Sequence, residues 1–234
     1  VLVVRDTRRG AATRARIAER APGATTEVIE ADLSLLQQAR AAAERIAAKH
    51  PRVAILVNNA GLFSERRRVT AEGHELVLAV NHLAPFVLTQ ALIDALRNGA
   101  PARIVNIGSA ASDDARIDLD DLEGVRRWSR MRAYGQSKLA LMMATFVWAE
   151  RLEGTGITAN VVHPGVVATN IGKVPGLVGI AWTLMMPFML SAERGADTPL
   201  HVALAPELEG VSGHYFKRRK EVQPNPLARD RALL

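Results

Sequence analysis

Short apolar runs alternate along the chain with longer segments in which apolar residues recur every three or four positions. The short runs predict strands at Val1–Val4, Thr25–Ala31, Val53–Val57, Arg103–Ile107, Ile157–Val162 and Gly213–Phe216. The longer segments predict helices at Thr7–Arg20, Leu35–Lys49, Thr70–Arg97, Tyr134–Glu153 and Ala192–Ala205. Because the strands are apolar throughout, we expect a parallel sheet covered by helices on both faces. This is a doubly wound, Rossmann-like α/β fold with three layers, α/β/α.

No internal repeat or linker divides the 234 residues. The apolar content, 48% of the residues, is sufficient to bury the core of one sizeable domain. We therefore expect a single domain over residues 1–220. Residues 221–234 are polar and contain proline, and they are interpreted as a surface tail.

Composition excludes several kinds of site. The chain has no cysteine, so disulfides, thiolate metal ligands and cysteine nucleophiles are excluded, and its histidines lack metal-ligand spacing. It opens on an apolar strand-like run and not on a basic leader. These features predict a cytoplasmic protein without a metal centre.

The net charge of +6 raises the question of nucleic-acid binding. The arginines are scattered, however, and only 4% of the residues are aromatic, which is poor material for base stacking. We expect a solvated basic surface and no nucleic-acid partner. The uncharged segment 174–192 is long enough for a membrane span, but Pro175 and Pro187 interrupt it. It is interpreted as an apolar flap, with peripheral membrane contact as the alternative.

Ligands of such a sheet bind at the carboxyl ends of its strands. The segments that follow four of the strands are rich in small and polar residues: "ADLS" (31–34), "NNAG" (58–61), "GSAAS" (108–112) and "HPGVVATN" (163–170). In "YGQSK", Tyr134 and Lys138 are one helical turn apart and leave the same helix face. Together these features predict one ligand site at this edge of the sheet.

These motifs, with the Asn of "VNHLAPFVLT", resemble the short-chain dehydrogenase/reductase family. The wide spacing between Ser109 and Tyr134 is similar to that of its retinol-dehydrogenase-like branch. The resemblance extends over nearly the whole chain. It implies an NAD(P)-dependent enzyme that interconverts an alcohol and its carbonyl compound.

One departure from the family is large. The family begins with a strand and a glycine-rich turn that receives the cofactor pyrophosphate, and this sequence contains neither. The absent strand would lie in the middle of the sheet. We interpret the sequence as most of a dehydrogenase whose cofactor cradle is not included in it.

The resemblance assigns four catalytic roles. Tyr134 is the acid/base, Lys138 lowers its pKa and holds the nicotinamide ribose, and Ser109 holds the substrate oxygen. Asn81 bends its helix and holds a water that relays protons to Lys138. A phenol pKa near 10 must fall by about three units for work at neutral pH, which needs about 4 kcal/mol from nearby positive charge.

The cofactor contacts follow from the same resemblance. They are Arg5, Asp32, Leu33, Asn58, Ala60, Gly61, Tyr134, Lys138, Pro164, Gly165, Val166 and Thr169. An arginine directly after the first strand pairs well with a ribose 2′-phosphate, so Arg5 favours NADP. The adjacent Asp6 keeps NAD as the alternative.

Three matters stay open on the sequence. The apolar flap favours a hydrophobic small-molecule substrate, and the resemblance implies pairing of two copies through the helices around Asn81 and Tyr134. A non-catalytic relative that acts as a binding or scaffold protein is the main alternative. A hydrolase using Ser109 and His163 is disfavoured, because the glycine that a nucleophile elbow needs two residues before the serine is missing.

Overall fold

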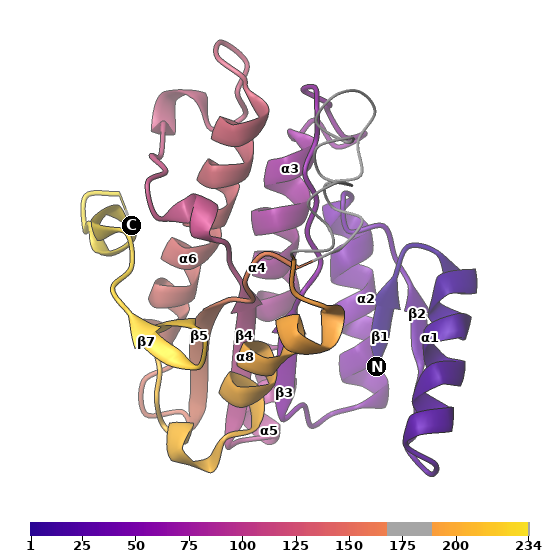
Figure 1. The fold of residues 1–234 in the computed structure, drawn as a ribbon. Helices are drawn as coiled ribbons and strands as arrows, with labels where there is room; N and C mark the ends of the chain where they lie inside the picture. The colour runs from indigo at the N-terminus through magenta and orange to yellow at the C-terminus, as the bar shows by residue number, and fades with distance from the viewer. Residues whose placement is uncertain (168–188, 234) are drawn as a thin grey trace.

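The computed structural model describes residues 1–167 and 189–233 (Figure 1). The strands are β1 (Leu2–Val4), β2 (Val28–Glu30), β3 (Ile55–Asn58), β4 (Ala102–Ile107), β5 (Ile157–His163), β6 (Tyr215–Lys217) and β7 (Lys220–Val222). The helices are α1 (Thr7–Arg20), α2 (Leu36–Lys49), α3 (Leu76–Leu78), α4 (Ala84–Ala91), α5 (Ile93–Asn98), α6 (Arg130–Arg151) and α8 (Ala192–Leu204). A π-helical turn, Ala79–Leu83, joins α3 to α4, and 3₁₀ turns lie at Ala110–Ser112, Leu119–Asp121, Pro206–Leu208 and Pro226–Arg229.

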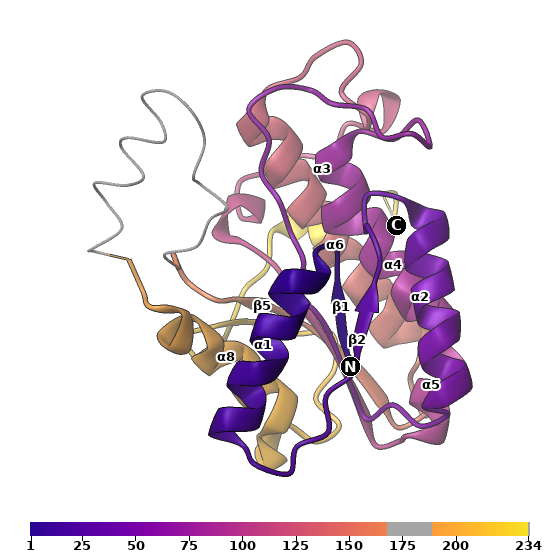
Figure 2. The same cartoon turned by 90° about the vertical axis from the view of Figure 1, so that its right-hand side faces the viewer.

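The sheet is mostly parallel, as the sequence predicts. Strands β3 to β7 hydrogen-bond in chain order, and only β7 runs antiparallel to its neighbour. Turning the molecule by 90° shows α1 and α8 on one face of the sheet and α2, α4 and α6 on the other (Figure 2). The largest apolar cluster joins α2, α4 and α6 to the strands, and a smaller one packs α8 against β4, β5 and β6. The three-layer, doubly wound fold is confirmed.

Strands β1 and β2 form a separate parallel pair. This pair lies beyond β3, at the right-hand side of Figure 1. Two apolar side chains of β3, Ile55 and Val57, are 39% and 44% exposed, unlike the fully buried interior of β4 and β5. The break between β1 and β3 is the position to which the family resemblance assigns the absent strand.

The helix expected at residues 70–97 begins later and is interrupted. Residues 70–74 form a turn in which Gly73 has φ +89°, and the Thr70 N–H donates to the His74 carbonyl. The helix therefore starts at Leu76, passes through the π-helical turn and ends in the separate helix α5.

Residues 221–229 of the predicted surface tail are tied to the rest of the domain. Arg218 and Arg219 adopt left-handed backbone angles, φ 50° and 61°, and reverse the chain into β7. The buried Asn225 then donates to the Ser112 carbonyl (2.9 Å) and the Ala115 carbonyl (2.8 Å). Sequence signals missed the hairpin because its turn lacks the Asn-Gly or Asp-Gly pair that usually supplies these angles.

The question of membrane contact through the apolar segment falls mostly on residues outside the described part of the chain, because 174–188 belong to the gap. In the described ranges, 1–167 and 189–233, no helix combines the length and the apolar character needed to cross a membrane.

Candidate active site

Ser109 and Tyr134 meet at the carboxyl edge of the sheet. Ser109 follows β4 and caps the 3₁₀ turn after it, and its side chain lies close enough to the Tyr134 phenol to act on the pKa of that phenol. The approach of α6 to this turn depends on Gly135, because a Cβ there would lie 2.9 Å from the Ala111 carbonyl oxygen. Gly108 is equally constrained, since a Cβ would lie 2.6 Å from Cγ1 of Val161. The structure thus places Ser109 near Tyr134 and adds Gly135, which sequence reasoning missed.

The surroundings of Tyr134 act on its pKa in opposite directions. Burial raises the pKa, and the nearby Ser109 side chain lowers it by less. The Phe63 ring packs edge-on against the Tyr134 ring, with centroids 5.3 Å apart. In the protein without cofactor the pKa is therefore raised, because desolvation outweighs the favourable contact, and the lowered pKa expected with the cofactor bound stays a prediction.

Lys138 is buried on the same helix, with 3% of its surface exposed. Its Nζ donates to the Ile107 carbonyl at 2.7 Å, and burial lowers its pKa to about 8. A Cβ on Gly61 would lie 3.3 Å from Nζ and 3.4 Å from Oδ1 of Asn81. The "NNAG" segment therefore passes directly over the ammonium group, and Gly61, Asn81 and Lys138 share one small region.

Asn81 is completely buried in the π-helical turn. Its Oδ1 accepts the Leu62 N–H (2.8 Å), while its Nδ2 donates to the Leu62 carbonyl and to Ser137 Oγ, both at 3.0 Å. Both amide hydrogens are used, so the second lone pair of Oδ1 is the group suited to a water. The helix is distorted into a π-helical turn at Asn81, and the proton-relaying water stays a prediction.

The amide of Asn58 has a structural role. Its Nδ2 donates to Oδ1 of Asn106 (2.7 Å) and to Oγ1 of Thr89 (3.3 Å), and Asn106 in turn donates to Thr145 on α6. This buried network ties β3, β4, α4 and α6 together. The predicted cofactor contact through the Asn58 amide is therefore corrected, because this side chain is directed into the protein. Only the backbone of Asn58 remains at the sheet edge, beside Ala60.

The separate β1–β2 pair carries three other predicted cofactor residues. Arg5 follows β1 and is exposed, whereas Asp32 and Leu33 follow β2. Oδ1 of Asp32 accepts the Ser34 N–H (2.9 Å), and the Asp32 N–H donates to Gln38 (2.8 Å), which fixes the loop to α2. Asp6 caps α1 by accepting the N–H groups of the two residues that follow Thr7. Asp6 therefore has a structural role that explains its presence beside Arg5.

The segment after β5 is held by the chain beyond the gap. Gly165 has φ +88°, and a Cβ there would lie 2.5 Å from Cδ1 of Leu190. The Leu190 N–H donates to the Val166 carbonyl (2.9 Å), and Val166 is 55% exposed beside Pro164. Thr169 lies outside the described residues.

His163 is the residue that a serine hydrolase would use together with Ser109. Nδ1 of His163 accepts the Ala110 N–H at 3.3 Å, so the imidazole supports the turn that Ser109 caps. Within residues 1–167 and 189–233, no group of three or more His, Asp or Glu side chains could hold a metal ion.

His82 provides a test of how the site region responds to acid. Its Nδ1 is buried and has no hydrogen-bond partner among the described residues, and burial lowers its pKa to about 4. The unfolded chain binds this proton more tightly, so stability is lost as the pH falls from about 6.5 towards 4. We expect the wild type to lose about 2 kcal/mol more unfolding free energy than His82→Gln between pH 7 and pH 5. Urea titrations at the two pH values measure this difference, and equal pH dependence of the two proteins would contradict the assignment.

A doubly wound sheet with Ser109, Tyr134 and Lys138 gathered at its carboxyl edge defines a nicotinamide-dependent oxidoreductase. A family model described as short chain dehydrogenase matches residues 1–175. The chain belongs to this short-chain dehydrogenase family, and it is an NAD(P)-dependent oxidoreductase that acts on CH–OH groups.

Relatives and solved structures agree with this membership. Retinol dehydrogenase 12 of Mus musculus is 40% identical over 230 residues, covering 98% of this chain and 73% of the relative. The human protein of the same name is 40% identical over 229 residues, covering 98% and 72%. A blue fluorescent protein from a metagenomic library, in complex with NADPH, has a TM-score of 0.70 at 29% identity, covering 92% of this chain and 83% of that one. A short chain dehydrogenase of Burkholderia cenocepacia, in complex with NADP, has a TM-score of 0.68 at 28% identity, covering 91% and 83%.

Proposed function

We propose that the protein is an NADP-dependent oxidoreductase that interconverts an apolar alcohol and its carbonyl compound, with Tyr134 as the acid/base. The observation that carries the proposal is the closeness of the Ser109 side chain to the Tyr134 phenol, one helical turn from the buried Lys138. Nothing in the packing of a helix requires a phenol, a hydroxyl and a buried ammonium group to meet at the ligand-binding edge of a sheet.

The side chains divide the chemistry between them. Ser109 Oγ holds the substrate oxygen, and Tyr134 donates its phenolic proton to that oxygen as the carbonyl is reduced, or removes the proton in the reverse direction. Lys138 provides positive charge that stabilises the phenolate formed when Tyr134 gives up its proton. A nicotinamide cofactor, when bound, would supply or accept the hydride. Asn81 holds the water through which the proton on Tyr134 is restored.

The residues present suit a nicotinamide cofactor at this edge. Gly61 leaves no side chain between the "NNAG" backbone and Nζ of Lys138, which is the close approach that a ribose needs. Lys138 has three donors, and its hydrogen bond to Ile107 accounts for one of them. Lys138 and the backbone of Ala60 and Gly61 would therefore hold the ribose beside Tyr134.

The preference for NADP rests on Arg5. It is exposed at the carboxyl end of β1, and the neighbouring Asp6 is committed to capping α1. A guanidinium group at this place can form charge-assisted hydrogen bonds with a 2′-phosphate. Two structural neighbours contain NADP or NADPH, which supports the same preference.

Arg5→Gln tests the cofactor preference. We expect the KM for NADPH to rise by about 10- to 100-fold, the equivalent of one lost charge-assisted hydrogen bond, with the KM for NADH nearly unchanged. Arg14→Gln, on the exposed surface of α1, is the matched control. Equal effects of Arg5→Gln on both cofactors would contradict a 2′-phosphate contact.

The substrate class is proposed from two observations. The relatives named above are retinol dehydrogenases, and the aromatic ring of Phe63 lies against Tyr134, where it provides an apolar wall. We propose retinoid-like or long-chain primary alcohols and their aldehydes. NADPH consumption with retinal, decanal and acetaldehyde tests this, with kcat/KM expected to fall in the order of decreasing apolar surface. A preference for acetaldehyde would contradict it.

A further inference from the structure

A buried carboxylate lies where the connection between β4 and α6 reaches the start of α3. Glu75 is 2% exposed, and its Oε2 caps α3 by accepting the Leu78 N–H at 2.9 Å. Its Oε1 accepts the indole N–H of Trp128 at 3.4 Å. Burial of a carboxylate is costly unless its hydrogen-bonding capacity is used. The two oxygens of Glu75 thus join two segments that are far apart in the sequence.

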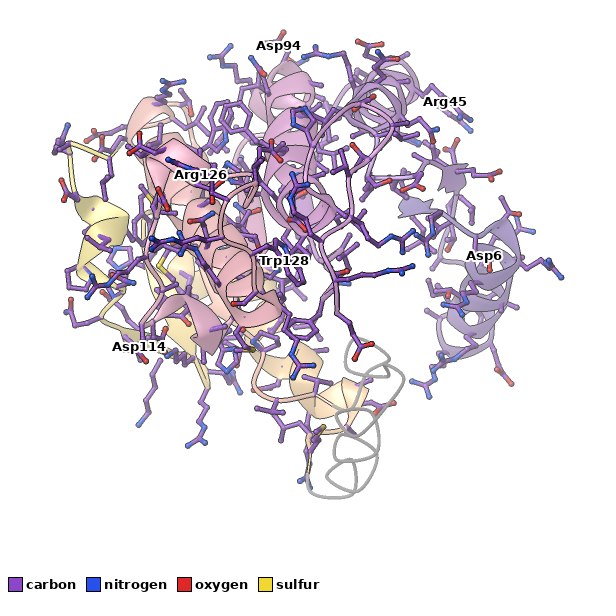
Figure 3. The ribbon with its side chains drawn as sticks, turned by 90° about the horizontal axis from the view of Figure 1, so that it is seen from above. Asp6, Arg45, Asp94, Asp114, Arg126 and Trp128 are labelled. Carbon is purple, nitrogen blue, oxygen red and sulfur yellow. The ribbon has the colours of Figure 1, made fainter. Side chains whose placement is uncertain are left out.

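The same connection is fastened to α6. Gln136, 4% exposed, donates to the Leu122 carbonyl (3.0 Å) and accepts the Asp118 N–H (2.9 Å). Arg132 forms an ion pair with Asp118. Trp128 lies toward the middle of the molecule when it is viewed from above (Figure 3). It also packs against Gly124, where a Cβ would lie 2.9 Å from its Cδ1.

Both of the joined segments lead into the active site. From Leu78 the chain continues directly into the π-helical turn that holds Asn81, and α6 carries Tyr134 at its amino-terminal end. Further along both segments, Nδ2 of Asn81 donates to Oγ of Ser137 on α6 at 3.0 Å. Glu75 thus joins the start of α3 to the segment just before α6, and Asn81 joins the π-helical turn after α3 to α6 itself. Tyr134 lies on α6 between these two contacts.

We propose that Glu75 is a positioning residue, which with Trp128 holds the start of α6 against α3 and so places Tyr134 on Ser109. The proposal deepens the function proposed above and, in its catalytic consequence, rests on it. A carboxylate suits the role because both of its oxygens accept. A glutamine would turn one N–H towards the N–H of either Leu78 or Trp128.

The charges around Glu75 are mixed. Glu123 packs against it, accepts the Glu75 N–H and contacts His74 at 3.0 Å, and the small cavity beside Glu75 is also lined by Asp121, Arg127 and Arg132. Burial, with a smaller contribution from Glu123, raises the pKa of Glu75, while its backbone and Trp128 hydrogen bonds act the other way. Because the carboxylates of Asp121 and Glu123 lie beside Glu75, substitution tests the proposal more cleanly than acidification does.

Hydrogen exchange of the protein without cofactor or substrate provides the first test. In Glu75→Gln and in the milder Trp128→Phe, we expect amides 79–83 and 130–138 to exchange about fivefold faster or more, because one hydrogen bond between the elements is lost. Ile46→Val, a core change on α2, is the destabilising control and leaves these amides unchanged. Faster exchange confined to residues 75–78 would show a local helix cap only and would overturn the proposal.

Turnover provides the second test. We expect each variant to lower kcat about tenfold with the KM for NADPH unchanged, and the double variant to lose little more than Glu75→Gln, because both substitutions break one contact. Independent losses that multiply would overturn the proposal. The two tests separate the two claims. If the two variants show the faster exchange but the wild type has no turnover, the proposed function is overturned and the contact between α3 and the start of α6 is still supported.

Discussion

Replacing Tyr134 with phenylalanine is expected to lower kcat for carbonyl reduction by at least about a thousandfold, the scale of a lost general acid. The substitution removes only the hydroxyl group that lies near the Ser109 side chain. The ring that packs against Phe63 is kept, so the fold is expected to be preserved. NADPH binding is expected to stay within about threefold of the wild type, because the lost group acts on the substrate oxygen.

Steady-state NADPH consumption and fluorescence titration of the nicotinamide measure the two quantities for Tyr134→Phe. Tyr215→Phe is the matched control, because it removes the chain's other phenol, which hydrogen-bonds to Asp113 at 3.2 Å. The control is expected to keep kcat within about fivefold, since that phenol contacts Asp113 and the backbone carbonyl of Ser109 (3.5 Å), and the Ser109 hydroxyl is left unchanged. A Tyr134→Phe protein with kcat within tenfold of the wild type would remove the tyrosine from the mechanism.

Lys138→Met is expected to lower kcat/KM about a hundredfold or more at neutral pH, because the phenolate of Tyr134 loses its nearby positive charge. The pKa of Lys138 is lowered by burial to about 8. The wild type itself therefore loses this charge as the pH rises above about 8, and the two activities are expected to converge in alkaline solution. Rates measured across this pH range test the prediction, and a constant ratio between the proteins would contradict it.

The stability of Lys138→Met separates catalysis from folding. The folded-state pKa lies below that of the unfolded chain, so the charged lysine lowers stability, and the full cost of about 3 kcal/mol is present below pH 8. Methionine removes this cost but leaves the Ile107 carbonyl without its donor. We expect a Tm at pH 7 that is equal to or above that of the wild type. A large fall in Tm would assign Lys138 a structural role.

The sheet and the site edge could be predicted from the sequence because both depend on short, local patterns. A mostly apolar run such as β5 is stable in a buried parallel sheet, where both of its faces are covered. The spacing of Tyr134 and Lys138 alone places them on one face of a helix. Ser109 could be placed beside them because parallel strands present their carboxyl ends at one edge. These predictions needed no knowledge of side-chain contacts.

Other features depend on contacts between distant residues. The pKa of Tyr134 is set by desolvation, which a sequence does not show, and the amide of Asn58 turns inward because Asn106 and Thr89 offer it partners. The capping of α3 by Glu75 and its contact with Trp128 joins residues 53 positions apart. The β7 hairpin was missed for a related reason, since tertiary packing of Asn225 overrides the unfavourable turn residues.

The most direct test of the account is a single turnover of the wild-type protein with NADPH and retinal, followed by product analysis. We predict that one retinol forms for each NADPH oxidised, and that Tyr134→Phe forms almost none while binding NADPH normally. If folded wild-type protein binds NADPH and oxidises none of it with retinal or any other apolar aldehyde, the assignment of Tyr134 as the acid/base of an NADP-dependent oxidoreductase is contradicted.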